Sequence, residues 1–151
     1  MKRILTATVV GLMCLGGTAG AQSARTPAAD VVEARQAAMM LSGVAMGSIK
    51  AAVDAGQPIA SQRFATRALA RWAHAVPGAF PTGSGAEAGV RTTARPEVWS
   101  DRAGFEAKAA DYATAADRLA ELAAGDDAAA FSAQLAVVRA SCQSCHDAYK
   151  S

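Results

Sequence analysis

The sequence predicts an all-α protein, an antiparallel four-helix bundle, on three observations. Alanine, the strongest helix former, fills 40 of the 151 positions. Aromatic residues, which favour strands, make up only 5% of the chain. Four segments carry apolar residues at three- and four-residue spacings, as helices do when they bury one face. The connections between these segments are short or moderate, which is typical of antiparallel neighbours in a bundle.

The first 21 residues have the pattern of a secretory signal peptide. Met1, Lys2 and Arg3 form a basic start, residues 4–15 are an apolar run, and residues 19–21 read Ala-Gly-Ala. A basic start, a short apolar run and an A-x-A site together are typical of an exported chain. The apolar run is shorter than the roughly 20 residues that a membrane span needs. We therefore expect cleavage after Ala21, a mature domain over residues 22–151, and a periplasmic location.

Cleavage changes the charge and the cysteine count. Lys2, Arg3 and Cys14 leave, so 13 basic side chains face 13 acidic ones and two cysteines remain. A balanced chain of this kind gives no reason to expect binding to nucleic acid or to an anionic membrane. Because no second long apolar run follows, we expect no membrane span in the mature protein.

The first two helices are expected over residues 30–55 and 59–76. Asp30 can cap the first helix, and glycine and proline at residues 56–58 separate it from the second. The apolar stripe of the first helix has a seven-residue spacing, and that of the second has a 4-3-4 spacing. The two stripes are Val32, Met39, Met46 and Val53, then Ala65, Leu69, Trp72 and Val76.

The third helix is expected to begin at Pro96 or Ser100 and to end near residue 124. The fourth helix is expected to begin after residues 125–127 and to end near residue 149. Residues 77–95 are rich in glycine and proline and form the long loop before them. Gly125 can stop the third helix, and an aspartate after it can cap the fourth. Their stripes are Phe105, Ala109, Tyr112, Ala116 and Leu119, then Phe131, Leu135, Val138, Cys142, Cys145 and Tyr149.

Residues 142–146 read C-x-x-C-H, the attachment signal for a c-type haem. Positions i, i+3 and i+4 share one face of a helix, so the thiols of Cys142 and Cys145 can bond both vinyl groups of one porphyrin. The adjacent His146 can then bind the iron as the proximal ligand. Because both cysteines continue the apolar stripe, the sequence predicts one covalently bound haem c inside the bundle. The many alanines then leave room for a porphyrin among Met39, Met46, Phe105 and Leu135.

Three other roles of the cysteine pair stay open at this point. A redox dithiol usually belongs to a thioredoxin-like βαβ unit, and no strands are apparent. A zinc site would need further ligands, and His74 has no second C-x-x-C or H-x-x-x-H beside it. A disulfide between residues three apart is the third role. An exported helical protein that uses the pair as a dithiol switch is thus the alternative from a different functional class.

The sequence resembles the class II c-type cytochromes, the cytochrome c prime family. Four features carry the resemblance: the C-x-x-C-H close to the last residue, then EARQAAM at residues 33–39, FPTGS at 80–84 and RPEVW at 95–99. The resemblance implies a four-helix bundle with the haem near one end and often a homodimer. It also implies a periplasmic role, either in electron transfer with redox partner proteins or in the binding of small gases.

The resemblance places Met39 on the distal side of the haem. If Met39 coordinates the iron, the protein is a one-electron carrier that cycles between Fe(III) and Fe(II) and is not an enzyme. If Met39 only occludes the site, the iron is five-coordinate and binds nitric oxide or carbon monoxide. Met40, Met46 and His74 are weaker candidates for the same position. Arg35 and Gln36 match family residues near the haem propionates, for which a guanidinium is well suited.

Overall fold

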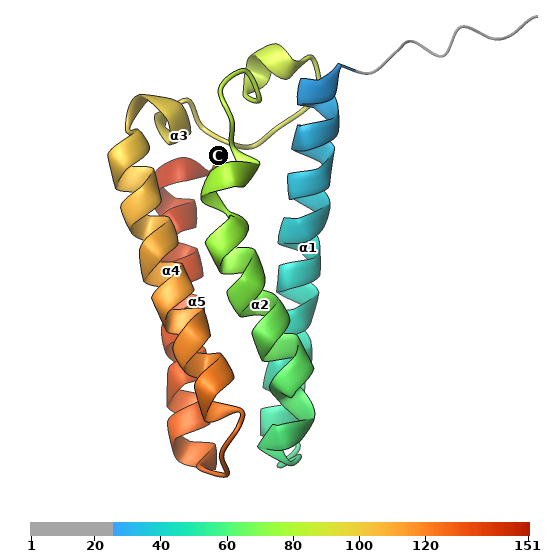
Figure 1. The fold of residues 1–151 in the computed structure, drawn as a ribbon, viewed down its shortest axis with the longest axis vertical. Helices are drawn as coiled ribbons and strands as arrows, with labels where there is room; N and C mark the ends of the chain where they lie inside the picture. Colours follow the sequence, from blue (N-terminus) through green and yellow to red (C-terminus); the bar gives the residue numbers. More distant parts are fainter. Residues whose placement is uncertain (1–25) are drawn as a thin grey trace, which may run out of the picture.

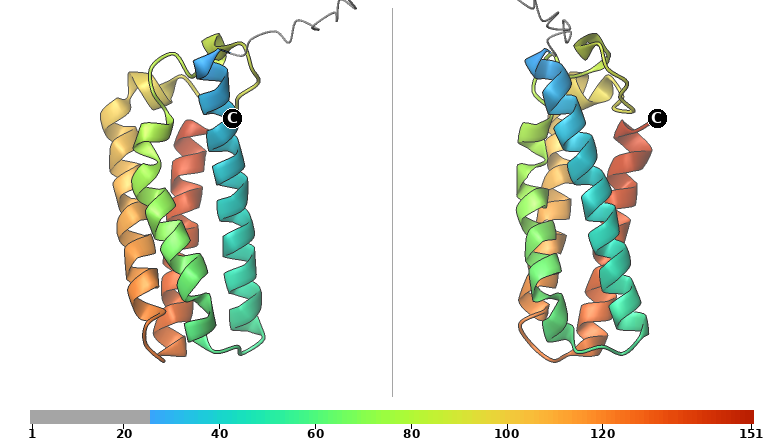
Figure 2. Two further views of the ribbon diagram at one scale, coloured as in Figure 1. Left: turned by 45° about the vertical axis from the view of Figure 1, so that its right-hand side comes forward. Right: turned by 90° about the vertical axis from the view of Figure 1, so that its right-hand side faces the viewer.

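The computed structural model describes residues 26–151. The expected signal peptide, residues 1–21, lies outside these residues, as does the start of the expected mature domain. Four long helices run alternately up and down in a bundle, which confirms the predicted fold class (Figures 1 and 2). They are α1 (Pro27–Asp54), α2 (Arg63–Ala75), α4 (Arg102–Leu122) and α5 (Ala128–Tyr149).

The first helix begins earlier than predicted, and its cap is Thr26 instead of Asp30. The Thr26 hydroxyl oxygen accepts a hydrogen bond from the backbone N–H of Ala29 at 3.2 Å, and Pro27 follows as the first helical residue. Proline is favoured there because the N–H that it lacks has no partner within the helix. Asp30 instead lies in the first turn, where its negative charge favours the helix dipole.

The second and third predicted helices each begin with a separate short helix. Residues Ile59–Gln62 form a 3-10 helix, η1, before α2 begins at Arg63. Residues Glu97–Ser100 form a single helical turn, α3, and Asp101 then caps α4 by accepting from the backbone N–H of Gly104 at 3.2 Å. The fourth helix starts as predicted, with Asp127 accepting from the backbone N–H of Ala130 at 2.9 Å.

The predicted stripes of α4 and α5 form most of the core. Every residue of the α4 stripe is buried, and so are Phe131, Leu135, Val138 and Tyr149 of the α5 stripe. Edge-to-face contacts join Phe105 to Phe80 and to Tyr149, with ring centroids 5.0 and 5.4 Å apart. Aromatic pairs of this geometry contribute about 0.5–1.5 kcal/mol beyond the area they bury. Phe105 thus belongs to an aromatic cluster near the loop end of the bundle.

α1 is buried only near its two ends. Its buried residues are Ala29, Val32 and Arg35 at one end and Ile49 and Ala52 at the other, with none between. This helix is also long and apolar enough to cross a membrane, a property that the core helices of soluble proteins and signal sequences share. The middle of α1 therefore forms a wall of the bundle without being enclosed by it.

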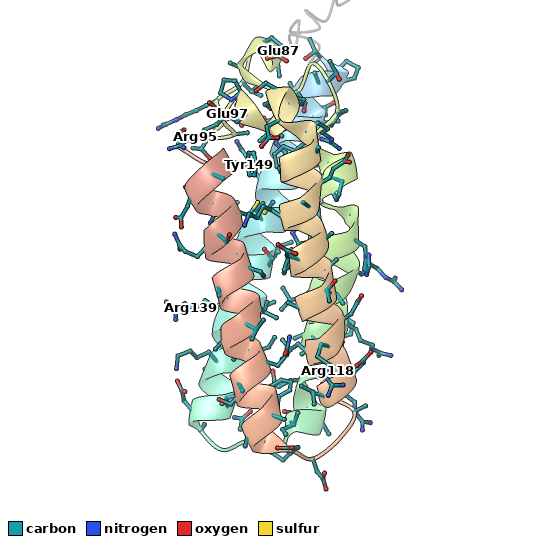
Figure 3. All side chains as sticks on the ribbon, turned by 90° about the vertical axis from the view of Figure 1, so that its left-hand side faces the viewer. Glu87, Arg95, Glu97, Arg118, Arg139 and Tyr149 are labelled. Carbon is teal, nitrogen blue, oxygen red and sulfur yellow. The ribbon has the colours of Figure 1, made fainter. Side chains whose placement is uncertain are left out.

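The loop between α2 and α4 is fastened to the end of α5. It contains two short 3-10 helices, η2 (Pro77–Ala79) and η3 (Ala86–Ala88). The backbone N–H of Arg95 donates to the carbonyl of Tyr149 at 2.9 Å, and that of Ser151 donates to the carbonyl of Thr93 at 3.0 Å. The Tyr149 hydroxyl donates to Asp101 at 2.7 Å. Figure 3 shows Tyr149 and Arg95 together at this end of the bundle.

Candidate functional site

A cavity of about 560 Å³ lies inside the bundle, bordered by α1, α2, α4 and α5. Its volume is within the range of about 300–1,000 Å³ that ligand and cofactor pockets occupy. Small side chains leave much of this space open, and at Gly43 and Gly47 an added Cβ would meet nothing within 4 Å. Its lining includes Met39, Gly43, Met46, Gly47, Trp72, Val76, Ala109, Tyr112, Leu135, Ala136, Cys142, Cys145 and His146. Of the four apolar residues expected around the porphyrin, Met39, Met46 and Leu135 line the cavity, whereas Phe105 lies in the aromatic cluster.

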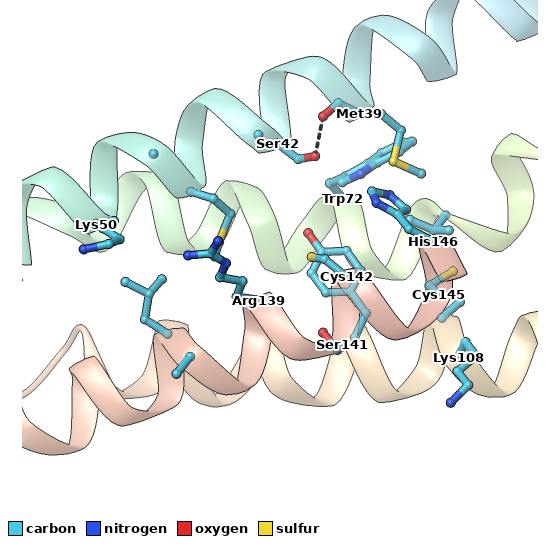
Figure 4. Close-up of a pocket in the computed structure, with 18 of the residues that line it drawn as sticks. Met39, Ser42, Lys50, Trp72, Lys108, Arg139, Ser141, Cys142, Cys145 and His146 are labelled. Carbon is cyan, nitrogen blue, oxygen red and sulfur yellow. Dashed lines mark hydrogen bonds between the residues drawn. The ribbon is translucent and has the colours of Figure 1, made fainter. Parts of the chain in front are cut away.

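The C-x-x-C-H residues all line this cavity from α5. Cys142 and Cys145 are half-buried free thiols, and His146 lines the cavity while remaining exposed to solvent. Figure 4 shows the three side chains projecting from one face of the helix, as their i, i+3 and i+4 spacing requires. The lining therefore presents two thiols and one imidazole to the same space, a set of groups that fits a covalently attached haem.

The electrostatics of the motif do not resemble those of a redox dithiol. Burial raises the pKa of Cys142, and burial together with the Cys142 sulfur raises the pKa of Cys145 despite the opposing charge of Lys108. Reactive dithiols have a lowered thiol pKa, because the thiolate is the reacting form.

Burial, and then the charge of Lys150, lower the pKa of His146, while the charge of Asp147 acts in the opposite direction. The imidazole is thus neutral at neutral pH, the form that binds metals.

Met39 lines the same cavity from α1, the helix opposite the motif. Figure 4 shows its thioether directed into the space that the His146 ring also enters. Its backbone carbonyl accepts a hydrogen bond from the Ser42 hydroxyl at 2.7 Å. Met46 lines the cavity further along α1, whereas Met40 is 69% exposed on the outer face. Met39 is therefore placed opposite the proximal candidate, and Met40 is not.

Arg35 and Gln36 do not line the cavity. The buried guanidinium of Arg35 donates to the hydroxyl and the carbonyl of Ser84, both at 2.7 Å, and to the hydroxyl of Thr92 at 3.0 Å. It also lies over the ring of Phe80, 4.5 Å from the centroid. The Gln36 amide donates to the carbonyl of Arg91 at 2.8 Å. Both side chains hold the loop, and their role at the haem propionates stays a prediction.

Two polar-tipped aromatics in the cavity were not among the expected site residues. Trp72 of α2 has its indole Nε1 buried, with no hydrogen-bond partner among the described residues. Tyr112 of α4 lines the cavity too, and burial and then the nearby Cys142 raise its pKa, so it is neutral at neutral pH. Both lie on predicted core stripes. Buried tryptophan and tyrosine usually need a hydrogen-bond partner. Their place on a core stripe could therefore have marked them as site residues from the sequence alone.

The zinc alternative finds no support in residues 26–151. His74 is exposed on α2 and lies 2.9 Å from a carboxylate oxygen of Asp117. No three His, Cys, Asp or Glu side chains in this part of the chain are grouped so as to hold a metal ion. His74 is therefore a surface histidine, as its position outside the motif suggested.

Comparison with known proteins gives one consistent family. The family model described as Cytochrome C' matches residues 30–150. The chain is 33% identical to cytochrome c' of Allochromatium vinosum, over 99% of both chains. It is 32% identical to cytochrome c-556 of Agrobacterium fabrum, over 99% of this chain and 95% of that one.

Solved structures agree in fold. Cytochrome c' from Thermochromatium tepidum has a TM-score of 0.75 at 30% identity, covering 85% of this chain and 99% of that one. A cytochrome c' described as having an unusual ligand-controlled dimer dissociation has a TM-score of 0.75 at 28% identity, covering 83% and 97%. A nitric oxide complex of a mutant cytochrome c prime from Alcaligenes xylosoxidans has a TM-score of 0.72 at 30% identity, covering 82% and 94%.

Proposed function

The chain belongs to the cytochrome c' family and carries one covalently bound haem c, and from this we propose that it is a periplasmic one-electron carrier. The observation that supports the proposal is the shared cavity, in which His146 of α5 and Met39 of α1 face one space. Two protein ligands on opposite sides leave no iron position open to an outside molecule. Such a centre is suited to passing single electrons to and from redox partner proteins.

Each residue then has a defined task. Cys142 and Cys145 hold the haem through thioethers, and His146 binds from the proximal side. The haem supplies one-electron chemistry at its iron, and the surrounding chain tunes the potential through axial ligation and a low-dielectric shell. Arg35 and Gln36 are proposed to reach the haem carboxylates from the loop end. No substrate bond is made or broken in this role, so we expect no enzymatic activity.

A second candidate is a five-coordinate protein that binds nitric oxide or carbon monoxide, with Met39 only filling the distal side. The similar protein from Alcaligenes xylosoxidans is described in complex with nitric oxide. In this chain, Gly43 and Gly47 line the same cavity as Met39 and place no side chain in it. Methionine also fills apolar gaps readily without acting as a ligand.

The optical spectrum of the reduced holoprotein separates the two functions. If Met39 coordinates, we expect a sharp low-spin α-band that carbon monoxide leaves unchanged. The Met39→Ala variant should then become high-spin and bind carbon monoxide, because the sixth position is freed. Met46→Ala is the matched control: it removes a thioether from the same cavity and should leave the spectrum unchanged. A high-spin spectrum of the unmodified protein that changes with carbon monoxide would favour the second candidate.

We propose that a second copy of the chain covers the outer face of α1. Met40, Leu41 and Val44 form a stripe on this face, and each is 68–69% exposed. A similar protein is described as a dimer whose dissociation is controlled by ligand. Contiguous exposed apolar residues of this kind are typical of an interaction surface. Phe64 on α2 is also an exposed apolar side chain, with 80% of its surface open to solvent.

Charges on this face are expected to abolish the dimer. The variant Leu41→Glu/Val44→Glu should give the molar mass of one chain by light scattering at a concentration where the unmodified holoprotein gives that of two. The reason is that two carboxylates would be buried without partners. Val137→Glu, at a 51% exposed apolar site on α5, is the matched control and should remain dimeric. A monomeric unmodified protein at all concentrations would refute the interface.

A further inference from the structure

The indole N–H of Trp72 is a buried donor without an acceptor among the described residues. More than about 90% of buried polar groups in folded proteins have a partner, and leaving one unpaired costs about 1–3 kcal/mol. The other indole of the chain has an acceptor even though its bond is exposed to solvent, since Trp99 Nε1 donates to the carbonyl of Pro81 at 3.0 Å. The unpaired donor of Trp72 is therefore a feature that needs an explanation.

Trp72 opens onto the haem cavity instead of a solid core. It lines the same cavity as Met39 and His146, which come from α1 and α5 (Figure 4). Trp72 itself comes from α2, which packs against α1 and α4, so its indole reaches the cavity from a third helix. The missing acceptor is thus expected to arrive with the cofactor or with a molecule that the cofactor binds.

The surroundings favour a neutral acceptor. The cavity lining includes apolar side chains such as Val76, Ala109 and Leu135, and its cations are Lys50, Lys108 and Arg139. A carboxylate in such surroundings carries a large desolvation cost that one neutral N–H does not offset. The cationic side chains of the lining, Lys50, Lys108 and Arg139, are the better partners for a carboxylate. A small uncharged molecule pairs with an indole N–H without this cost.

We infer that Trp72 donates its indole N–H to a diatomic gas held in the haem cavity on the Met39 side, with Trp72 as a positioning and affinity-determining residue. This inference rests on the haem site and on the second candidate function, in which Met39 does not ligate the iron. In that role the indole N–H of Trp72 polarises and thereby stabilises the bound molecule. The cost of burying this N–H away from water is compensated only when the molecule is present. The cavity volume beside Met39 and the unpaired N–H then have one common explanation.

Carbon monoxide is the probe, and the Met39→Ala holoprotein keeps the sixth iron position open under either proposed function. We compare the reduced Met39→Ala protein with Met39→Ala/Trp72→Phe. The C–O stretching band should move to higher wavenumber in the double variant, because a hydrogen bond to the ligand oxygen weakens the C–O bond. Carbon monoxide should also dissociate about 2- to 10-fold faster, the range implied by a neutral hydrogen bond of about 0.5–1.5 kcal/mol.

Trp99→Phe in the same background is the matched control, because it removes an indole N–H that already has an acceptor. The C–O stretching band of that control variant should not move.

A second measurement uses hydrogen–deuterium exchange at the indole nitrogens. Deuterium should shift the C–O band of the Met39→Ala protein and that of Met39→Ala/Trp99→Phe equally. It should leave the band of Met39→Ala/Trp72→Phe unchanged, because that variant lacks the N–H that contacts the ligand.

Each other outcome has a distinct meaning. If the haem-loaded Met39→Ala protein does not bind carbon monoxide, the gas-binding role and the inference both fail. If carbon monoxide binds and the band is the same with and without the Trp72 indole, the inference alone fails. A change confined to the midpoint potential, with no change in the C–O band, would assign the indole to a haem carboxylate and overturn the inference as well.

Discussion

Exchange of Cys142 and Cys145 for alanine is expected to abolish the covalent haem adduct. The two thiols line one cavity from one helix face, and no other cysteine is present in residues 26–151. Without them the haem has no thioether bond and is held only by ligation and packing. Intact-mass measurement under denaturing conditions, after export in cells that attach haem, should give the mass of the bare polypeptide for the variant. The unmodified protein should be heavier by one haem.

The matched control is Ser141→Ala. Ser141 also lines the cavity, and its hydroxyl donates to the carbonyl of Val138 at 2.7 Å, but it can form no thioether. This variant should keep the full haem mass. A bare polypeptide mass for the unmodified protein would refute haem attachment itself. An adduct that survives the double exchange would place the anchor at other residues.

Arg35→Gln is expected to destabilise the fold by about 2–4 kcal/mol, since hydrogen bonds of charged donors contribute about 1.5–3 kcal/mol each and a cation–π contact contributes about 0.5–2 kcal/mol. The substitution removes the bonds that fix Ser84 and Thr92 and the contact with Phe80. Burial lowers the pKa of Arg35 and the charge of Glu87 raises it, but an arginine stays protonated near neutral pH. Denaturant unfolding of the holoprotein gives the free energy of unfolding.

Arg118→Gln provides the comparison for this measurement. Arg118 forms an exposed ion pair with Glu121 at 2.9 Å on the surface of α4, a contact that contributes only about 0–1 kcal/mol. Its removal should change stability little. If Arg35→Gln is equally mild but shifts the midpoint potential, the guanidinium serves the haem carboxylates more than the loop. That result would support the proposed role of Arg35 at the haem carboxylates.

The apolar stripes of the helices and the C-x-x-C-H motif could be predicted from the sequence, because they depend on periodicity or on residues close together in the chain. The burial of Phe131, Leu135 and Val138 follows from a single helical repeat, and the common face of Cys142, Cys145 and His146 follows from their spacing. These features need no knowledge of which helix packs against which. They account for the fold class and for the haem-binding face of α5.

Other features depend on partners that are distant in sequence. The acceptors of Arg35 lie 49 and 57 residues away, in a loop whose path glycine and proline do not determine. The start of α1 moved because Thr26 and Pro27 together form a stronger start signal than Asp30 alone. The unpaired N–H of Trp72 became visible only once α1, α2 and α5 were seen to enclose one cavity.

The burial of α1 at its two ends alone has a mechanical consequence. Between Arg35 and Ile49 no residue of this helix is fully buried, and only partly buried side chains such as Met39, Ala45 and Met46 pack against the core. Gly43 and Gly47 lie in that stretch, and each weakens a helix by about 1 kcal/mol relative to alanine. In a single copy of the chain we therefore expect this stretch to bend more easily than the other sides of the cavity. Met39 lies in it and would move with it, so the proposed second copy would also hold Met39 in place.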